Sequence, residues 1–277
     1  MGGISMYFVK SVIDIFMVLL LLRLVIQPNE AYFNPIYRLI YRITDPVLIP
    51  FRYVTRDATK GVLMCIVGLV VLRGLVFLAI SPMSVISGIS ISFLNLFQLL
   101  FQAYMVMWFV FVLSQRAFGT SFLNLIQRAF TPIFRIAGRF GIRRGYSPLF
   151  VFLFLWISYA LLNVIIRTIA VPRIVVSPLL LVHGFADGLM LVLGLFTFPG
   201  FFSLVIVVGA VLSWVSPDPS NPIVQAIYGI SEPLLSPFRR FVPLLGGIDF
   251  SPIIAIFCFQ ILGGLGQQLI AGLLRAL

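Results

Sequence analysis

Long apolar segments alternate along this chain with shorter segments that carry most of its charged residues. About 20 helical residues cross the hydrocarbon core of a bilayer. Apolar segments long enough to do so lie near residues 5–27, 62–80, 93–114, 149–171, 201–216 and 252–274. The pattern therefore predicts an all-α integral membrane protein with about six transmembrane helices.

A seventh apolar stretch, near 178–198, does not fit this scheme directly. The pairs His183-Gly184 and Asp187-Gly188 lower the hydrophobicity of this stretch, and Pro199-Gly200 separates it from the apolar segment that follows. We expect a re-entrant or interfacial segment near 178–198, followed by a separate span. The alternative is one long bent helix across 174–216.

The polar connections between the spans repeat one another. The first and the last share an Asn-Pro pair, an acid-Pro pair and a Pro-Phe-Arg triplet, at residues 34–35, 45–46 and 50–52 and again at 221–222, 232–233 and 237–239. A shortened copy, Thr131-Pro132 followed by Phe134-Arg135, lies between them. Because self-similarity at fixed spacing indicates a repeated architecture, we predict three hairpins of helix, polar connection and helix. They are residues 1–80, a divergent middle repeat over 81–172, and 173–277, which includes the outer segment.

Each connection is expected to contain a short amphipathic helix in the membrane interface. In the first connection Ile36, Ile40, Ile43 and Val47 recur at helical spacing, and a second stripe holds the charged residues Arg38, Arg42 and Asp45. Proline disfavours helix at the residue before it. We therefore expect these helices to end at the residues before Pro46, Pro132 and Pro233.

Polar residues also mark the return of the chain to the membrane. Asp57 and Asp249 lie just before the next span, where a negative charge near a helix N-terminus is favoured. Thr59 and Ser251 are suitable N-cap residues. A structural role alone can explain them.

Composition excludes a soluble protein. Hydrophobic residues make up 61% of the 277 residues and charged residues only 10%, which leaves too few polar groups to cover a soluble surface. The net charge of +11 could suggest nucleic-acid binding, but thirteen of the 19 Lys and Arg lie in the three connections. By the positive-inside rule these connections face the cytoplasm, so both termini lie outside.

Basic residues so close to a membrane favour contact with anionic lipid headgroups rather than direct contact with nucleic acid. The candidates for contact with lipid or with a partner protein are Arg38, Arg42, Asp45, Arg52, Asp57, Arg135, Arg239, Arg240 and Asp249. Four further charges, Asp14, Arg23, Arg73 and Arg167, fall within predicted spans, where a charge is costly. Each arginine either snorkels to the interface or belongs to a buried pair, for example Arg73 with Asp14, that fixes helix order or gates a path.

Catalytic chemistry has little support. The single histidine, His183, precedes Asp187 by four residues, and no third metal ligand is evident. We find no carboxylate pair in a plausible pocket and no phosphate-binding glycine-rich loop. Cys65 and Cys258 fall inside predicted spans, where packing is their expected role. We expect no enzymatic activity, no cofactor and no metal.

The connection motifs resemble those of the YggT (YlmG) family of small integral membrane proteins. The resemblance is specific at 246–252, Gly-Gly-Ile-Asp-Phe-Ser-Pro, preceded by 232–240, and in the first repeat at 20–23, 34–35, 44–46 and 50–52. Members carry one or two such repeats rather than three. The resemblance implies a multi-pass protein of the bacterial inner membrane, with no enzymatic activity. It also implies links to cell division, tolerance of osmotic stress and, in plastids, nucleoid distribution and cytochrome assembly.

Two hypotheses follow. The first is a non-enzymatic membrane scaffold or assembly factor whose basic hairpins contact anionic lipid and an unidentified membrane or cytoplasmic protein, or a second copy of the chain. The second is a small channel or transporter-like protein that uses the intramembrane charges, supported by the broken segment near Pro199.

Overall fold

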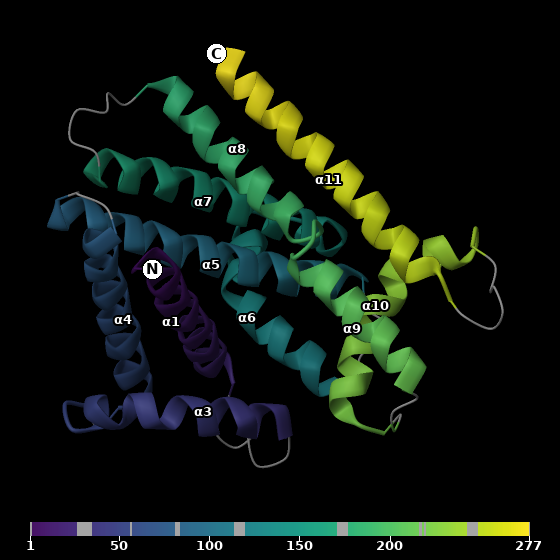
Figure 1. The fold of residues 1–277 in the computed structure, drawn as a ribbon, viewed down its shortest axis with the longest axis horizontal. Coiled ribbons are helices and arrows are strands. Elements are labelled where there is room, and N and C mark those ends of the chain that lie inside the picture. The colour runs from purple at the N-terminus through teal and green to yellow at the C-terminus, as the bar shows by residue number, and fades with distance from the viewer. Residues whose placement is uncertain are drawn as a thin grey trace. The chain divides into compact units, whose positions relative to one another are not determined.

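The protein is built from helices, as its hydrophobic pattern predicts. The computed structural model describes residues 2–26, 35–55, 57–80, 84–113, 120–170, 177–215, 218, 220–242 and 249–276, and none of these residues is in a strand. The α-helices are α1 (Gly2–Val25), α3 (Pro35–Arg52), α4 (Ala58–Ile80), α5 (Val85–Leu113), α6 (Thr120–Arg139), α7 (Ser147–Ala170), α8 (Pro178–Gly194), α9 (Phe201–Val215), α10 (Pro222–Arg239) and α11 (Ser251–Ala276) (Figure 1).

Four of these helices are long and apolar enough to cross a membrane: α4, α5, α7 and α11. α1 has 24 residues, but Lys10, Asp14 and Arg23 interrupt its apolar surface. α8 and α9 are apolar and shorter, with 17 and 15 residues. At 1.5 Å per residue, α9 is about 22 Å long and falls short of a hydrocarbon core of about 30 Å. The chain is an all-α membrane protein.

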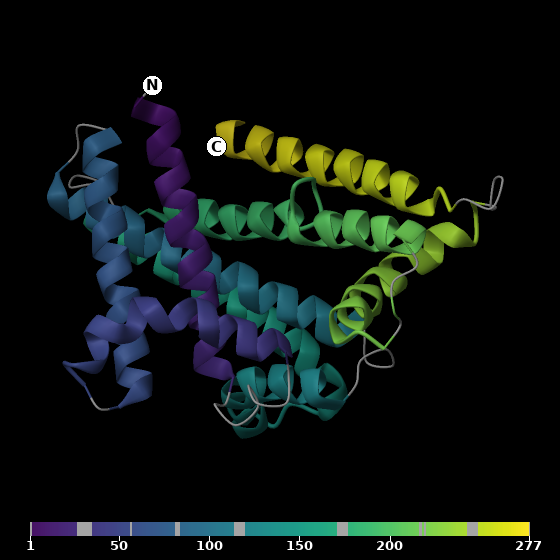
Figure 2. The same cartoon turned by 60° about the horizontal axis from the view of Figure 1, so that its bottom comes forward.

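The described residues form two compact units, residues 1–103 with 161–181 and residues 104–160 with 182–277. In the first unit α1, α3 and α4 pack against one another, and α3 lies across the other two (Figures 1 and 2). Met17 and Leu20 from α1 and Val70 from α4 are fully buried in this packing. In the second unit α9, α10 and α11 pack against one another. Each set of three helices therefore has the predicted order of helix, connection and helix.

The helices of the connections do not end before their prolines, so that expectation is wrong. α3 continues through Pro46 and Pro50, α6 through Pro132, and α10 through Pro233 and Pro237. A proline inside a helix removes one backbone hydrogen bond and bends the helix. Both prolines of α3 are exposed, so the carbonyl groups that lose their donors lie on its outer side. Packing of the opposite side keeps the helix intact.

The buried face of α3 is rotated from the predicted stripe. Tyr37, Ile40, Thr44 and Leu48 are buried, whereas Ile43 is exposed. Ile36 has a side chain outside the described part of the structure. The rotation has a polar cause, because Arg23 of α1 reaches Thr44 and its neighbour Asp45 and holds that flank of α3 against α1.

The region 178–215 contains two helices rather than one long bent helix. α8 and α9 are separated by turns over 195–200 that include a cis peptide bond between Phe198 and Pro199. At Gly200 an added Cβ would lie 2.1 Å from the carbonyl oxygen of Gly194, so only glycine fits this tight break. Beyond the break α9 continues along the line of α8 in both views (Figures 1 and 2).

Candidate functional site

Arg23, near the end of α1, is held by three residues of α3. Its Nη1 donates to Thr44 Oγ1 at 2.6 Å, and its Nη2 donates to Asp45 Oδ1 at 2.8 Å. Its guanidinium carbon lies 4.1 Å from the ring centre of Tyr41, in cation–π geometry. The side chain is only 9% exposed. Arg23 therefore does not simply snorkel, and we call Tyr41, Thr44 and Asp45 together the Arg23 site.

Helical spacing explains how α3 presents this site. Residues three and four positions apart lie on one face of a helix, which places Tyr41 beside Thr44 and Asp45. The buried hydroxyl of Thr44 donates to the carbonyl oxygen of Ile40 at 2.7 Å. Its lone pairs therefore remain available to accept from Arg23.

The C-terminal hairpin repeats these residue types without the arginine. Tyr228, Ser231 and Glu232 of α10 have the same spacing as the Arg23 site, and they precede the repeated Pro-Phe-Arg triplet by the same distance. α9 contains no charged residue. Ser213 lies two residues before the end of α9, as Arg23 lies two residues before the end of α1.

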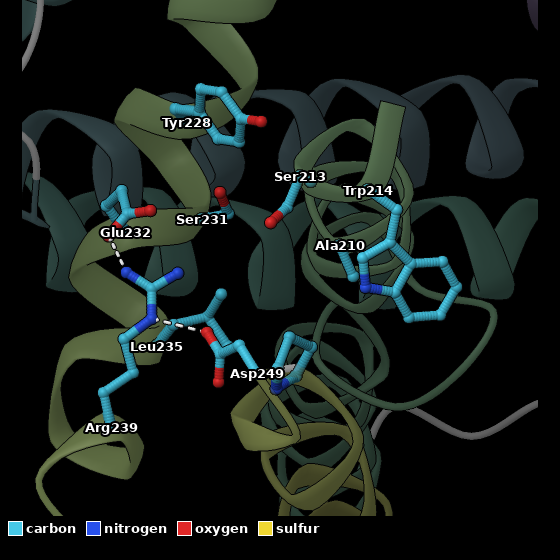
Figure 3. A pocket seen from close by; sticks show the side chains of 11 residues that line it. Ala210, Ser213, Trp214, Tyr228, Ser231, Glu232, Leu235, Arg239 and Asp249 are labelled. Atoms are coloured by element: carbon cyan, nitrogen blue, oxygen red, sulfur yellow. Dashed lines mark hydrogen bonds and ion pairs between the residues drawn. The ribbon is translucent and has the colours of Figure 1, made fainter. Parts of the chain in front are cut away.

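A cavity of about 330 Å³ occupies the corresponding place. We call it the α9–α10 cavity; its lining comes from α9, from α10 and from the start of α11 (Figure 3). The lining residues are Gly209, Ala210, Ser213, Trp214, Tyr228, Ser231, Glu232, Leu235, Arg239, Asp249 and Pro252. In Figure 3 the hydroxyls of Ser213 and Ser231 face the space between α9 and α10.

Arg239 joins α10 to the start of α11 at one side of this cavity. Its Nε donates to Asp249 Oδ2 at 2.8 Å, and its Nη1 donates to Glu232 Oε2 (Figure 3). Asp249 Oδ1 also accepts from the backbone N–H of Ser251 at 2.9 Å. In the first hairpin Asp57 Oδ1 accepts from Thr59 N at 3.0 Å. At both helix starts the aspartate therefore does the capping for which Thr59 and Ser251 were suggested.

The surroundings of Asp249 keep its carboxyl ionised. Burial raises the pKa of this group, but the hydrogen bonds from Ser251 and Arg239 and the positive charge of Arg239 together lower it more. The pKa therefore lies below its usual value. Opposing effects also act on Arg239: burial lowers its pKa, whereas its bonds to Glu232 and Asp249 raise it above the usual value. Asp249 and Arg239 are thus both charged at neutral pH.

Asp14 and Arg73 form an ion pair between α1 and α4. Arg73 Nη1 lies 2.5 Å from Asp14 Oδ1, and the Arg73 side chain is only 2% exposed. Lys10 and Arg73 each place their charge 5.9 Å from the ring centre of Phe77. Pairing, rather than snorkelling, therefore describes Arg73. The pair joins two neighbouring helices directly.

Five of the other predicted candidates lie on exposed surfaces. Arg38, Arg42 and Asp57 in the first hairpin, Arg135 in the middle segment and Arg240 at the end of α10 are all exposed. The Arg52 side chain lies outside the described part of the structure. Arg167 lies in α7 with a partly buried side chain.

Within the described ranges no group of three His, Cys, Asp or Glu could hold a metal ion.

Sequence reasoning missed the aromatic and hydroxyl members of the two matched sites. Tyr41 and Tyr228, and Thr44 and Ser231, occupy equivalent places in the repeat. Extending the comparison four residues upstream of each acid-Pro pair would have found them. The significance of an α9 without charged residues was harder to detect, because it depends on which face of α9 meets α10.

The profile of the CCB3/YggT family matches residues 3–80 and 188–270, which together are more than half of the chain. An uncharacterized protein of Haemophilus influenzae is 42% identical over 94 residues, covering 32% of this chain and 51% of that protein. An uncharacterized protein of Pseudomonas aeruginosa is 48% identical over 62 residues, covering 22% and 30%. The uncharacterized protein YggT of Escherichia coli is 40% identical over 81 residues, covering 26% and 43%.

The chain thus spans about half or less of the length of these relatives. No solved structure matches it. The two regions that match the family contain the first hairpin, with α1, α3 and α4, and the last, with α9, α10 and α11. The middle copy lies outside both regions, and its status as a third repeat stays a prediction. The repeated hairpins and the family match agree, and the chain belongs to the CCB3/YggT family.

Proposed function

We propose that this protein is a non-enzymatic membrane scaffold or assembly factor that holds anionic lipid, and through it a partner protein, on its basic hairpins. The observation that carries the proposal is the outer surface of α3. Arg38 and Arg42 lie on one exposed flank, and Leu39 and Ile43 lie on the next exposed flank. The third side of the helix is buried against α1 and α4.

This arrangement fits a helix that lies in the plane of the membrane interface. An exposed apolar flank is costly in water and stable among acyl chains, whereas adjacent arginines reach the phosphate groups. Each basic residue near an anionic leaflet contributes about 1 kcal/mol of attraction. The hairpins then face the cytoplasm of a bacterial inner membrane, with both termini outside, as the placement of the basic residues favours.

The amphipathic helix of the middle segment, α6, also supports a position in the membrane interface. α6 buries Ile126, Phe130 and Ile133, whereas Arg135 and Arg139 are exposed on its other side. Arg42 of α3 and Arg135 and Arg139 of α6 are thus all exposed at the surface. A surface of this kind can concentrate acidic lipid and can dock an acidic segment of a partner protein, which is the action of a scaffold.

Replacing Arg38 and Arg42 together by glutamine is expected to reduce the enrichment of anionic lipid around the protein about tenfold or more, because two attractions of about 1 kcal/mol each are lost. The measurement is mass spectrometry of lipid retained after extraction from vesicles of phosphatidylglycerol and phosphatidylcholine. Arg275→Gln is the matched control, since Arg275 is exposed at the far end of α11, away from the connections. Equal retention by all three proteins would refute a lipid-binding role for α3.

A further inference from the structure

We propose that the α9–α10 cavity binds an organic monocation, a guanidinium or primary ammonium group, in the place that Arg23 takes in the first hairpin. The inference goes beyond the scaffold role and does not depend on it. It rests on the residues that hold Arg23, on their repetition around an open cavity, and on the charge and unused hydrogen-bonding capacity of that cavity.

The first step is the equivalence of the two sets of residues. In the N-terminal hairpin a guanidinium contacts an aromatic ring, a buried hydroxyl and a carboxylate. Around the cavity Tyr228, Ser231 and Glu232 supply the same three groups from the same helix face. These are the groups that recognise a guanidinium or ammonium ion in general. Glu232 and the ring of Tyr228 come from α10, and the opposite wall of α9 brings Ser213, Trp214 and two small residues, none of them charged (Figure 3).

The second step is the charge of the cavity. Its lining contains two carboxylates, Glu232 and Asp249, and one guanidinium, that of Arg239. Both carboxylates are bonded to Arg239, so one negative charge remains in excess. In the first hairpin Arg23 supplies the balancing charge to Asp45. No α9 residue is charged, so α9 offers no counterpart of Arg23, and a cationic ligand would supply the balancing charge.

The third step is an unused hydroxyl. Ser231 is only 1% exposed, and its Oγ has no hydrogen-bond partner within the described part of the chain. A buried polar group without a partner is costly. Its counterpart Thr44 accepts from Arg23. The Ser231 Oγ lies against Gly209, so a donor in the cavity would satisfy it after the side chain turns toward the cavity. Ammonium and guanidinium groups carry only donors.

The fourth step is size and access. A cavity of about 330 Å³ accepts a small head group, and its rim is exposed at Trp214 and Arg239. Two sources offer this chemistry next to a membrane: a soluble amine or guanidine, and the ethanolamine headgroup of a lipid. The experiment separates them.

The test uses the full chain in phosphatidylcholine nanodiscs, titrated with methylguanidinium and with ethylammonium, and follows the unfolding temperature and the heat of binding. We expect a saturable rise in unfolding temperature. Glu232→Gln is expected to weaken binding about tenfold or more, since a charge-assisted bond is lost. Arg240→Gln, which removes an exposed charge that does not line the cavity, is expected to leave binding unchanged.

A reciprocal variant supplies the ligand from the chain itself. Ser213→Arg brings a guanidinium to the α9 wall of the cavity, so it is expected to abolish methylguanidinium binding and to raise the unfolding temperature without ligand. Ser213→Met fills similar space without the charge and is expected to lose binding without this rise. If Ser213→Arg does not fold, Glu232→Gln still decides the question.

Nanodiscs that contain phosphatidylethanolamine form the second arm. Weaker methylguanidinium binding in these discs identifies the lipid headgroup as the occupant, and unchanged binding identifies a soluble cation; both outcomes support the site. Two outcomes overturn it. The first is that neither cation binds saturably in discs of either lipid, and that no phosphatidylethanolamine from the native membrane occupies the cavity. The second is that a cation binds but Glu232→Gln and Ser213→Arg leave its binding unchanged.

Discussion

Replacing Arg73 by methionine is expected to destabilise the N-terminal hairpin by about 3 kcal/mol, the lower end of the range for breaking a buried ion pair. Arg73 is almost fully buried, and its partner Asp14 keeps some exposure, so the unpaired carboxylate recovers part of its solvation. A charge inside a membrane span is costly unless it is paired. The measurement is the free energy of unfolding of the protein in lipid nanodiscs, compared with wild type.

The double variant Arg73→Met with Asp14→Leu separates pairing from packing. Replacing both members of a buried pair by apolar residues is often nearly neutral, so the double variant is expected to recover most of the stability. Equal destabilisation of the single and double variants would show that the pair contributes through shape alone. The intramembrane charges would then not fix the order of α1 and α4.

The second large effect is expected at Arg23. Arg23→Ser removes an ion pair, a hydrogen bond to a buried hydroxyl and a cation–π contact. We expect a loss of about 2 kcal/mol in the free energy of unfolding. The variant also reproduces in the first hairpin the arrangement seen in the last. Methylguanidinium at millimolar concentration is therefore expected to restore part of the lost stability.

Arg240→Ser is the control for this experiment. Arg240 is exposed at the end of α10, and an exposed substitution of this kind changes stability by about 0.5 kcal/mol or less. Methylguanidinium should stabilise this control no more than it stabilises wild type. If Arg23→Ser is as stable as wild type, or if the cation does not restore it, the three residues around Arg23 are not a guanidinium site.

The sequence predicted the helices and their order because hydrophobic length and repeated motifs are local properties. It did not predict the path of α3 through Pro46 and Pro50, because the preference of a residue before proline is weak compared with the burial of a whole helix face. The rotation of that face could not be predicted either. It depends on Arg23 reaching α3 from another helix, which is a tertiary contact.

The charged residues within the predicted spans were identified from the sequence because a charge in a membrane is energetically costly. For Arg73 the sequence left two alternatives, snorkelling and pairing with Asp14, and the structure shows the pair. The α9–α10 cavity was not predicted. A missing arginine cannot be recognised as a sequence motif. Ser213 becomes a candidate only when the structure shows that it lines the same cavity as Ser231 and Glu232.

The scaffold role is tested most directly by extracting the protein from its native membrane in lipid particles and identifying by mass spectrometry what stays bound. We expect anionic lipid together with a protein partner in stoichiometric amount, with both reduced in the Arg38→Gln, Arg42→Gln variant and retained in Arg275→Gln. Recovery of the wild-type protein with neither anionic lipid nor a partner would contradict it.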